Sequence, residues 1–141
     1  MHEGLHYISC DAQTAKTNFD YLLTTPAEKD VHFVFELISD GKTFLTIYEN
    51  VTATASENII LNCNNNRLSS NSSLVSICHT PTSITTGVVK IFNGISGSSS
   101  KVGGNERSEI GFILKHSAKY LFRINAPVAV DFVLRFSWYE M

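Results

Sequence analysis

Apolar and polar residues alternate along the last part of the chain. Between Val128 and Tyr139 nearly every second side chain is a large apolar one, and the series ends at Trp138. Successive side chains of a β-strand point to opposite faces, so a period of two is typical of a strand with one buried face. The pattern predicts a strand over Val128–Tyr139 with Trp138 in the core.

Shorter stretches of the same kind predict further strands. Val31–Ile38 and Phe44–Tyr48 flank Asp40-Gly41, and an Asp-Gly pair suits a tight turn, so these segments are expected to form a hairpin. The other strands predicted in this way are Ile59–Leu61, Leu74–His79, Val88–Ile95, Ile110–Leu114 and Tyr120–Ile124. The last two and Val128–Tyr139 follow one another with short connections, which favours a β-meander.

The N-terminal third is less regular. Ala12, Ala15, Phe19 and Leu22 have helical spacing, whereas the segment from Phe19 to Leu23 alternates as a strand does. We favour the strand, because aromatic residues and threonine prefer pleated surfaces and no clear cap starts a helix. Residues 1–12 are interpreted as a possible N-terminal arm.

These elements predict a single all-β domain over residues 1–141. Many short strands at this spacing favour a two-sheet antiparallel β-sandwich, with a jelly roll as the expected connectivity. Four apolar residues fall on the second face of their strands: Val34, Ile38, Leu121 and Val133. A sandwich buries one face of each sheet, so these residues need cover from a neighbouring subunit or from the N-terminal arm.

Composition narrows the class of partner. The formal net charge is −2 and the charges are scattered, so no basic stretch exists to neutralise a row of phosphates, and nucleic-acid binding is disfavoured. No apolar stretch is long enough for a membrane-spanning helix, and the N-terminus does not resemble a signal peptide. Three cysteines at irregular spacings, Cys10, Cys63 and Cys78, are expected to be reduced and mostly buried thiols.

Two sets of residues were weighed as metal ligands. His2, His6 and Cys10 step by four, but no CxxC or HExxH motif accompanies them. Cys78 and His79 are adjacent, and a strand would point them to opposite faces, so we interpret both as packing residues. We therefore expect neither a metal nor another cofactor.

Candidate catalytic groups and sugar-binding surfaces have simpler interpretations. Ser96 lies in a Gly- and Ser-rich stretch without the spacing of a nucleophile elbow, and we interpret it as a linker residue. Glu106 and Glu109 are interpreted as solvated loop charges rather than a glycosidase pair. Among possible aromatic platforms for saccharides, Trp138 is expected in the core, whereas Tyr48 and Tyr139 are candidates for exposure.

Several short phrases, taken in order along the chain, resemble those of a known family. The phrases are His2-Glu3-Gly4, Leu23-Thr24-Thr25-Pro26-Ala27, Val31-His32-Phe33-Val34-Phe35 with Asp40-Gly41, Tyr48-Glu49-Asn50, Asn66-Arg67 with Asn71 to Ser73, His79-Thr80-Pro81-Thr82, Gly103-Gly104, Ile113-Leu114-Lys115, Lys119-Tyr120-Leu121 and Trp138-Tyr139-Glu140. Together they resemble a family of small tailed-bacteriophage virion proteins, regarded as head decoration (cement) or related structural proteins.

The resemblance implies a non-enzymatic protein, made in the bacterial cytoplasm, that binds the outer surface of the major capsid protein shell and stabilises it, as a homotrimer. Contacts with the capsid or between subunits are expected in the N-terminal segment and in the polar loops 62–73 and 96–108. The candidate contact residues are His2, Glu3, Gly4, Leu5, His6, Tyr7, Asn66, Arg67, Lys101, Val102 and Arg107.

Two alternatives to this function remain open from the sequence. One is a tail or fibre module that recognises a saccharide on the host surface. The other is an enzyme on a jelly-roll scaffold that uses the histidines as metal ligands. Fold alone does not separate these classes.

Overall fold

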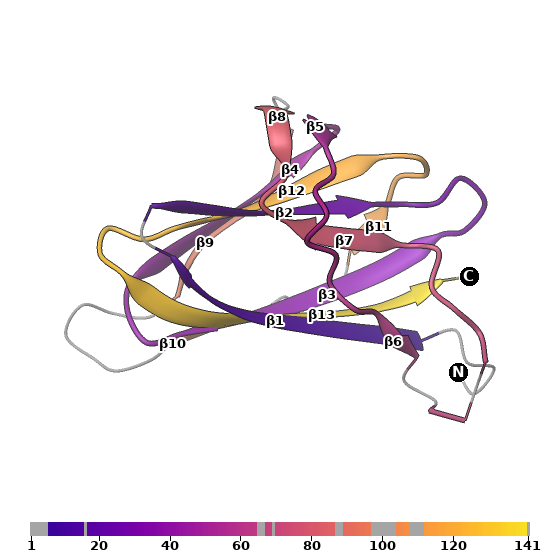
Figure 1. Cartoon of the computed structure of the whole chain (residues 1–141), viewed down its shortest axis with the longest axis horizontal. Helices are drawn as coiled ribbons and strands as arrows, with labels where there is room; N and C mark the ends of the chain where they lie inside the picture. Colours follow the sequence, from indigo (N-terminus) through magenta and orange to yellow (C-terminus); the bar gives the residue numbers. More distant parts are fainter. Residues whose placement is uncertain are drawn as a thin grey trace.

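The alternating segments of the chain form two antiparallel sheets that pack face to face in the computed structural model (Figure 1). The structure describes residues 6–15, 17–64, 67–68, 70–86, 89–96, 104–107 and 112–140, and only the backbone of residues 95, 96 and 104–107. The described part contains no helix, and therefore none that is long and apolar enough to cross a membrane. The predicted two-sheet antiparallel β-sandwich is confirmed, whereas its jelly-roll connectivity stays a prediction.

Each sheet mixes strands from distant parts of the chain. Sheet A contains, in spatial order, β10 (Gly104–Arg107), β3 (Val31–Ser39), β13 (Val130–Glu140), β1 (His6–Ala15) and β6 (Cys63–Asn64), and β11 (Phe112–Leu114) also pairs with β3. Sheet B contains β7 (Ser76–His79), β2 (Asn18–Thr24), β12 (Lys119–Asn125), β4 (Thr43–Glu49) and β9 (Val89–Ser96). A separate pair consists of β5 (Thr52–Thr54) and β8 (Thr82–Thr85).

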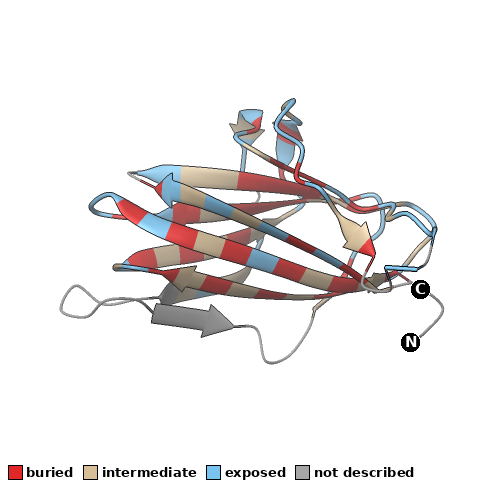
Figure 2. Cartoon of the chain, turned by 60° about the horizontal axis from the view of Figure 1, so that its bottom comes forward, coloured by how far each residue is buried: buried red, intermediate tan, exposed pale blue. Residues whose placement is uncertain are grey.

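The strand period predicted from the sequence sets the core. Buried residues alternate with half-buried or exposed ones along the long strands, as the bands of Figure 2 show. Aromatic rings from both sheets meet between them: the ring centroid of Phe122 in β12 lies 5.3 Å from that of Phe136 and 5.5 Å from that of Phe33. Trp138 is fully buried, as expected, and the segment from Phe19 to Leu23 is the strand β2.

The predicted hairpin around Asp40-Gly41 is wrong, although both of its strands exist. The strand β3 belongs to sheet A and β4 to sheet B, so the turn crosses from one layer to the other. Asp40 stays with β13: its N–H donates to Asp131 O (3.0 Å), and its Oδ1 accepts from Asp131 N (2.9 Å). A Cβ on Gly41 would lie 2.7 Å from Val130 Cγ1, so the crossing also depends on the small size of glycine.

The predicted β-meander is also wrong. The strands β11 and β13 both pair with β3 in sheet A, whereas β12 lies between β2 and β4 in sheet B. The chain therefore changes sheet twice in its last part. Each strand has one strongly apolar face, and two such strands can bury those faces against each other across the sandwich as well as side by side.

The N-terminal region and two other segments also differ from the predictions. Residues 6–12 belong to β1, which pairs with β13 over its whole length, so a separate arm over these residues is excluded; residues 1–5 lie outside the described part. Ile59 forms a single bridge with Cys78 in place of a strand over Ile59–Leu61. Residues 104–107 form β10 within the segment that was expected to be a loop.

The two outer faces of the sandwich are covered differently. On sheet B, Leu22, Cys78 and Leu121 are buried beneath Val51 and Ala53, at the β5–β8 pair, in a second apolar cluster. Of the four second-face residues singled out in the sequence, Leu121 is thus covered by its own chain. Val34, Ile38 and Val133 are only half-buried and lie on the outer face of sheet A.

Candidate functional site

The outer face of sheet A is the candidate site. Its members are the outward side chains of the paired strands, which the register places in rows across the sheet. We define this face by Ile113, His32, Tyr139 and His6 in the first row, Val34, Ser137, Ile8 and Cys63 in the second, Glu36, Arg135 and Cys10 in the third, Ile38, Val133 and Ala12 in the fourth, and Asp40, Asp131 and Thr14 in the last. Most side chains of its second and fourth rows are apolar.

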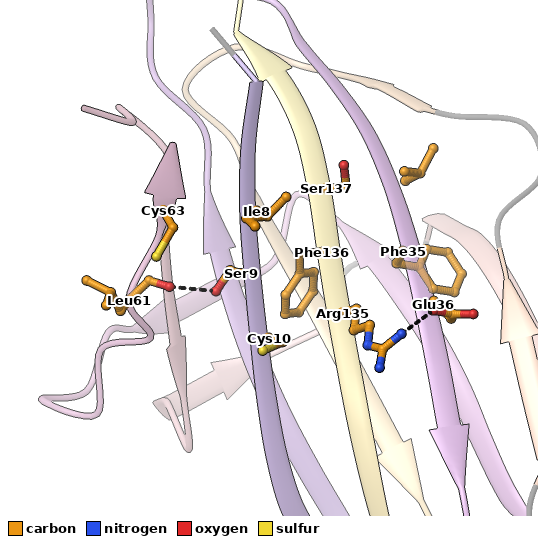
Figure 3. A pocket seen from close by; sticks show the side chains of 11 residues that line it. Ile8, Ser9, Cys10, Phe35, Glu36, Leu61, Cys63, Arg135, Phe136 and Ser137 are labelled. Carbon is orange, nitrogen blue, oxygen red and sulfur yellow. Dashed lines mark hydrogen bonds and ion pairs between the residues drawn. The ribbon is translucent and has the colours of Figure 1, made fainter. Parts of the chain in front are cut away.

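Short and long side chains alternate on this face and leave it hollowed. A hollow of about 530 Å³ spans β6, β1, β13 and β3, with Ile8, Leu61 and Val34 among its walls (Figure 3). A second hollow, of about 570 Å³, lies toward the Asp131 end and is lined in part by Ala12, Ile38 and Val133. Ile8 is 40% exposed and Leu61 78% exposed, so apolar groups reach the solvent here.

One ion pair stands in the middle of the face. Arg135 Nη1 lies 3.2 Å from Glu36 Oε1 across the β13–β3 ladder, and the arginine side chain is the more exposed of the two (Figure 3). In an exposed setting such a pair contributes about 1 kcal/mol or less to stability. Its position among apolar neighbours is therefore better suited to orienting a partner than to holding the fold.

A histidine of the first row and a serine of the second are hydrogen-bonded to each other. His6 Nε2 lies 2.7 Å from Ser137 Oγ, and the His6 ring stacks on Tyr139 at 4.3 Å between centroids. Burial lowers the pKa of His6. A serine nucleophile also needs N–H donors for an oxyanion, but β13 is an inner strand whose backbone at Ser137 faces Ile8 on one side and Val34 on the other. The backbone of Ser137 is thus engaged in the sheet, and the observed contact of the pair is a local hydrogen bond.

The structure does not support the metal sets weighed from the sequence. In the part of the chain that is described, no three His, Cys, Asp or Glu residues come together to hold an ion. His6 and Cys10 lie on a strand rather than on a helix, and His2 is outside the described residues. Cys78 and His79 are packing residues, as interpreted: Cys78 lies in the second apolar cluster, and the His79 ring lies 5.4 Å from that of Phe19.

The cysteines are free, but they are less buried than expected. Cys78 is buried, Cys63 is half-buried and Cys10 is exposed. Cys10 and Cys63 both lie on the outer face of sheet A and line its hollow of about 530 Å³. The expectation of mostly buried thiols is therefore wrong for Cys10.

The predicted contact residues do not gather at one place. His6 is on the outer face of sheet A, whereas Tyr7 is buried in the core with its hydroxyl donating to Ser72 O (3.3 Å). Arg67 is exposed at the same end of the sandwich as Tyr7. The backbone of Arg107, in β10, pairs with that of Glu36, in β3. The remaining candidates lie outside the described residues: His2, Glu3, Gly4, Leu5, Asn66, Lys101 and Val102.

The aromatic candidates for saccharide binding already have partners. Tyr139 stacks on His6, and Lys90 Nζ lies 5.7 Å from the centroid of the Tyr48 ring. Both tyrosines are half-buried. Neither offers a wide free ring face, and so the structure does not favour the saccharide alternative.

A polar cluster at the start of β12 has a testable pH dependence. Tyr120 donates a hydrogen bond to Glu49 Oε1 (3.1 Å) and accepts one from Lys115 N (2.9 Å). Burial, together with the Glu49 carboxylate, raises the pKa of Tyr120 from 10.0 to about 12. The unfolded chain therefore loses this proton first, so the stability contributed by the neutral phenol is complete below pH 10 and is lost as the pH rises from about 10 to 12.

Tyr120→Phe is expected to remove this alkaline dependence. At pH 8 the variant should be less stable than the wild type by about 1 kcal/mol, because Lys115 N loses its acceptor. The difference should shrink by about 1 kcal/mol by pH 11. Urea unfolding of both proteins over this pH range measures it, and a constant difference would contradict the assignment.

Comparisons with known proteins leave the site to be judged on its geometry. No protein-family model, no curated protein and no solved structure matches this chain.

Proposed function

We propose that this chain is a non-enzymatic structural protein of a tailed-bacteriophage virion, which binds the outer surface of the capsid shell and stabilises it. One observation carries the proposal: the outer face of sheet A presents apolar side chains on both sides of the Glu36–Arg135 pair, and the described part of the chain does not cover them. A folded protein rarely leaves such a face in water unless another protein packs on it. The resemblance in sequence supplies the virion as the assembly.

Sheet B supports this interpretation by contrast. The β5–β8 pair covers the central apolar residues of its outer face, and beside them lie the Asp20–Arg123 ion pair, at 2.9 Å, and Phe44 with Lys42 Nζ over its ring. The chain therefore covers one sheet itself and leaves the other for a neighbour. This asymmetry is expected of a subunit in an assembly.

Stabilisation would arise from added interface. A protein that binds the assembled shell and not its dissociated subunits shifts the equilibrium toward the shell by mass action. The sandwich supplies a rigid base for this role, because both of its sheets have long paired strands and an aromatic core. No reacting group is required for such a role.

The test is made on particles of the phage that encodes this chain. Virions assembled without the protein should lose their DNA at a lower temperature than wild-type virions, and adding the purified protein should restore the wild-type value. Mass spectrometry of wild-type virions should detect the chain in many copies. Absence from purified virions, or equal heat stability with and without it, would overturn the proposal.

A matched pair of variants tests which face matters. Ile8→Glu places a charge on the outer face of sheet A, whereas Thr46→Glu places one on the polar outer face of sheet B beside Asn93. Ile8→Glu should fail to restore heat stability, and Thr46→Glu should restore it. The reverse result would remove the outer face of sheet A from the proposal.

A further inference from the structure

We infer that the outer face of sheet A packs against the same face of a second copy of this chain, related by a half-turn about an axis across the strands. This rests on the proposed function in taking the face as a protein contact, but it gives the face to a second copy, so the pair would contact the shell through its other surfaces. Its test needs only the purified chain. The half-turn gives pairs of copies, whereas the resemblance led us to expect a homotrimer.

The two ends of the face are chemically complementary to each other. Two imidazoles, His6 and His32, lie in its first row, and two carboxylates, Asp40 and Asp131, lie in its last row. A half-turn across the strands reverses their direction and so places the first row of one copy over the last row of the other. His32 then comes over Asp40 of the second copy, so an imidazole N–H donor faces a carboxylate acceptor at both ends of the contact, while His6 comes over Thr14 and Tyr139 over Asp131.

The central rows are complementary in shape under the same operation. The second and fourth rows exchange, so Ile8 comes over Ala12 of the partner, and Ser137 over Val133. A larger side chain meets a smaller one in both cases, whereas Val34 comes over Ile38 and two branched apolar side chains meet there. The hollow of about 530 Å³ lies at the second row and the hollow of about 570 Å³ at the fourth row. The half-turn therefore places the first hollow of one copy opposite the second hollow of the other.

Opposite charges meet at the centre. Among the described side chains, Glu36 and Arg135 form the third row next to the axis, and two copies therefore bring the carboxylate of each close to the guanidinium of the other. Such a pair of opposite charges attracts the same pair turned round, whereas two charges of one sign would repel it. Such complementary charges set the register of a contact more than its strength.

The area of the face fits a pair at the weaker end of specific contacts. The three long strands β1, β13 and β3, at a spacing of ~4.8 Å and with about nine residues each at a rise of ~3.4 Å, give a projected area of about 440 Å² per copy. The accessible area of a surface made of side chains is larger than its projection. A specific interface buries about 800 Å² on each partner, with smaller values for weaker contacts.

The test uses charge exchange and a measurement of mass in solution by light scattering or sedimentation. The wild-type chain should form dimers. Glu36→Arg and Arg135→Glu should each raise the dissociation constant by about 100-fold or more, because each variant collects four like charges at the axis. An equimolar mixture of the two variants should restore dimers, since positive side chains at positions 36 and 135 of one copy then face negative ones at the same positions of the other.

Two further proteins separate this result from a loss of folding. The double variant Glu36→Arg/Arg135→Glu restores opposite charges in each copy and should dimerise, and Thr46→Arg on sheet B should dimerise as the wild type does. Circular dichroism should show the β spectrum for all variants. A wild-type chain that is monomeric at its highest soluble concentration would overturn the inference, as would single variants that dimerise with wild-type affinity or a mixture that stays monomeric. Capsid binding by a chain that proves monomeric would leave the proposed function standing.

Discussion

Glu140→Gln is expected to lower the free energy of unfolding by about 2–3 kcal/mol, although the two side chains have nearly the same shape. Glu140 is 2% exposed, and its carboxylate accepts hydrogen bonds from the segment that leads into β7 and from Trp138. Leu74 N donates to Oε1 at 2.9 Å, and Trp138 Nε1 donates to Oε2 at 2.8 Å. Ser73 Oγ also donates to Oε2.

An amide cannot serve all of these donors. Glutamine keeps one oxygen. Its NH₂ group would replace either Oε1, the acceptor of Leu74 N, or Oε2, the acceptor of Trp138 Nε1 and Ser73 Oγ. Either way a buried N–H is left without an acceptor. The carboxylate thus holds the 73–75 segment against the C-terminal end of β13. Glu140→Ala should cost more, about 3–5 kcal/mol, because it leaves every donor unmatched.

Ser73→Ala is the matched control, since it removes one donor and keeps the carboxylate. It should cost about 1 kcal/mol. Urea unfolding followed by Trp138 fluorescence measures all three variants, because this is the only tryptophan of the chain and it contacts the carboxylate directly. A glutamine variant within about 0.5 kcal/mol of the wild type would show that the hydrogen bonds to Glu140 add little.

The sequence was informative wherever a strand has one apolar face. The alternation from Val128 to Tyr139 located β13 and the burial of Trp138, and the shorter alternations located β2, β3 and β4. Period and face depend only on local residues, so a single sequence reveals them. The same alternation showed that Val34, Ile38 and Val133 are apolar residues on the second face of their strands, and all three belong to the candidate site.

Strand pairing was not accessible in the same way. The inward faces of β3 and β4 have the same apolar pattern whether the strands lie side by side or face each other across the core. Asp40-Gly41 suits a tight turn, but two contacts with Asp131 and the close approach of Val130 make it a crossing between layers. Val130 and Asp131 lie far from Asp40-Gly41 in the sequence, so the local sequence does not reveal these contacts.

The strand β1 was missed because its pattern is inverted. Its outward residues include Ile8, Cys10 and Ala12, whereas Asp11 and Gln13 point inward at the edge of the sandwich, where Tyr21 donates a hydrogen bond to Asp11 at 2.7 Å. An apolar outward face is the signal of a docking surface and not of a core strand. This inversion is the sequence feature that pointed to the candidate site without being recognised.

Leu121→Ala is expected to lower the free energy of unfolding by about 2–5 kcal/mol, which is the cost of a cavity in a closed core. Without the β5–β8 pair, Leu121 would lie uncovered on the outer face of sheet B, and its replacement by alanine would cost far less. Here it is fully buried beneath the β5–β8 pair, with Leu22 and Cys78 beside it and Val51 and Ala53 above. The second apolar cluster is therefore a small core of its own.

Leu61→Ala makes the same chemical change at the outer face of sheet A and serves as the control. Leu61 is 78% exposed, so the substitution should change the stability of the monomer by less than about 0.5 kcal/mol. Urea unfolding at protein concentrations where the chain is monomeric compares the two. Equal costs would mean that β5 and β8 do not protect sheet B, and the contrast between a covered face and an uncovered one would then no longer support a docking role for sheet A.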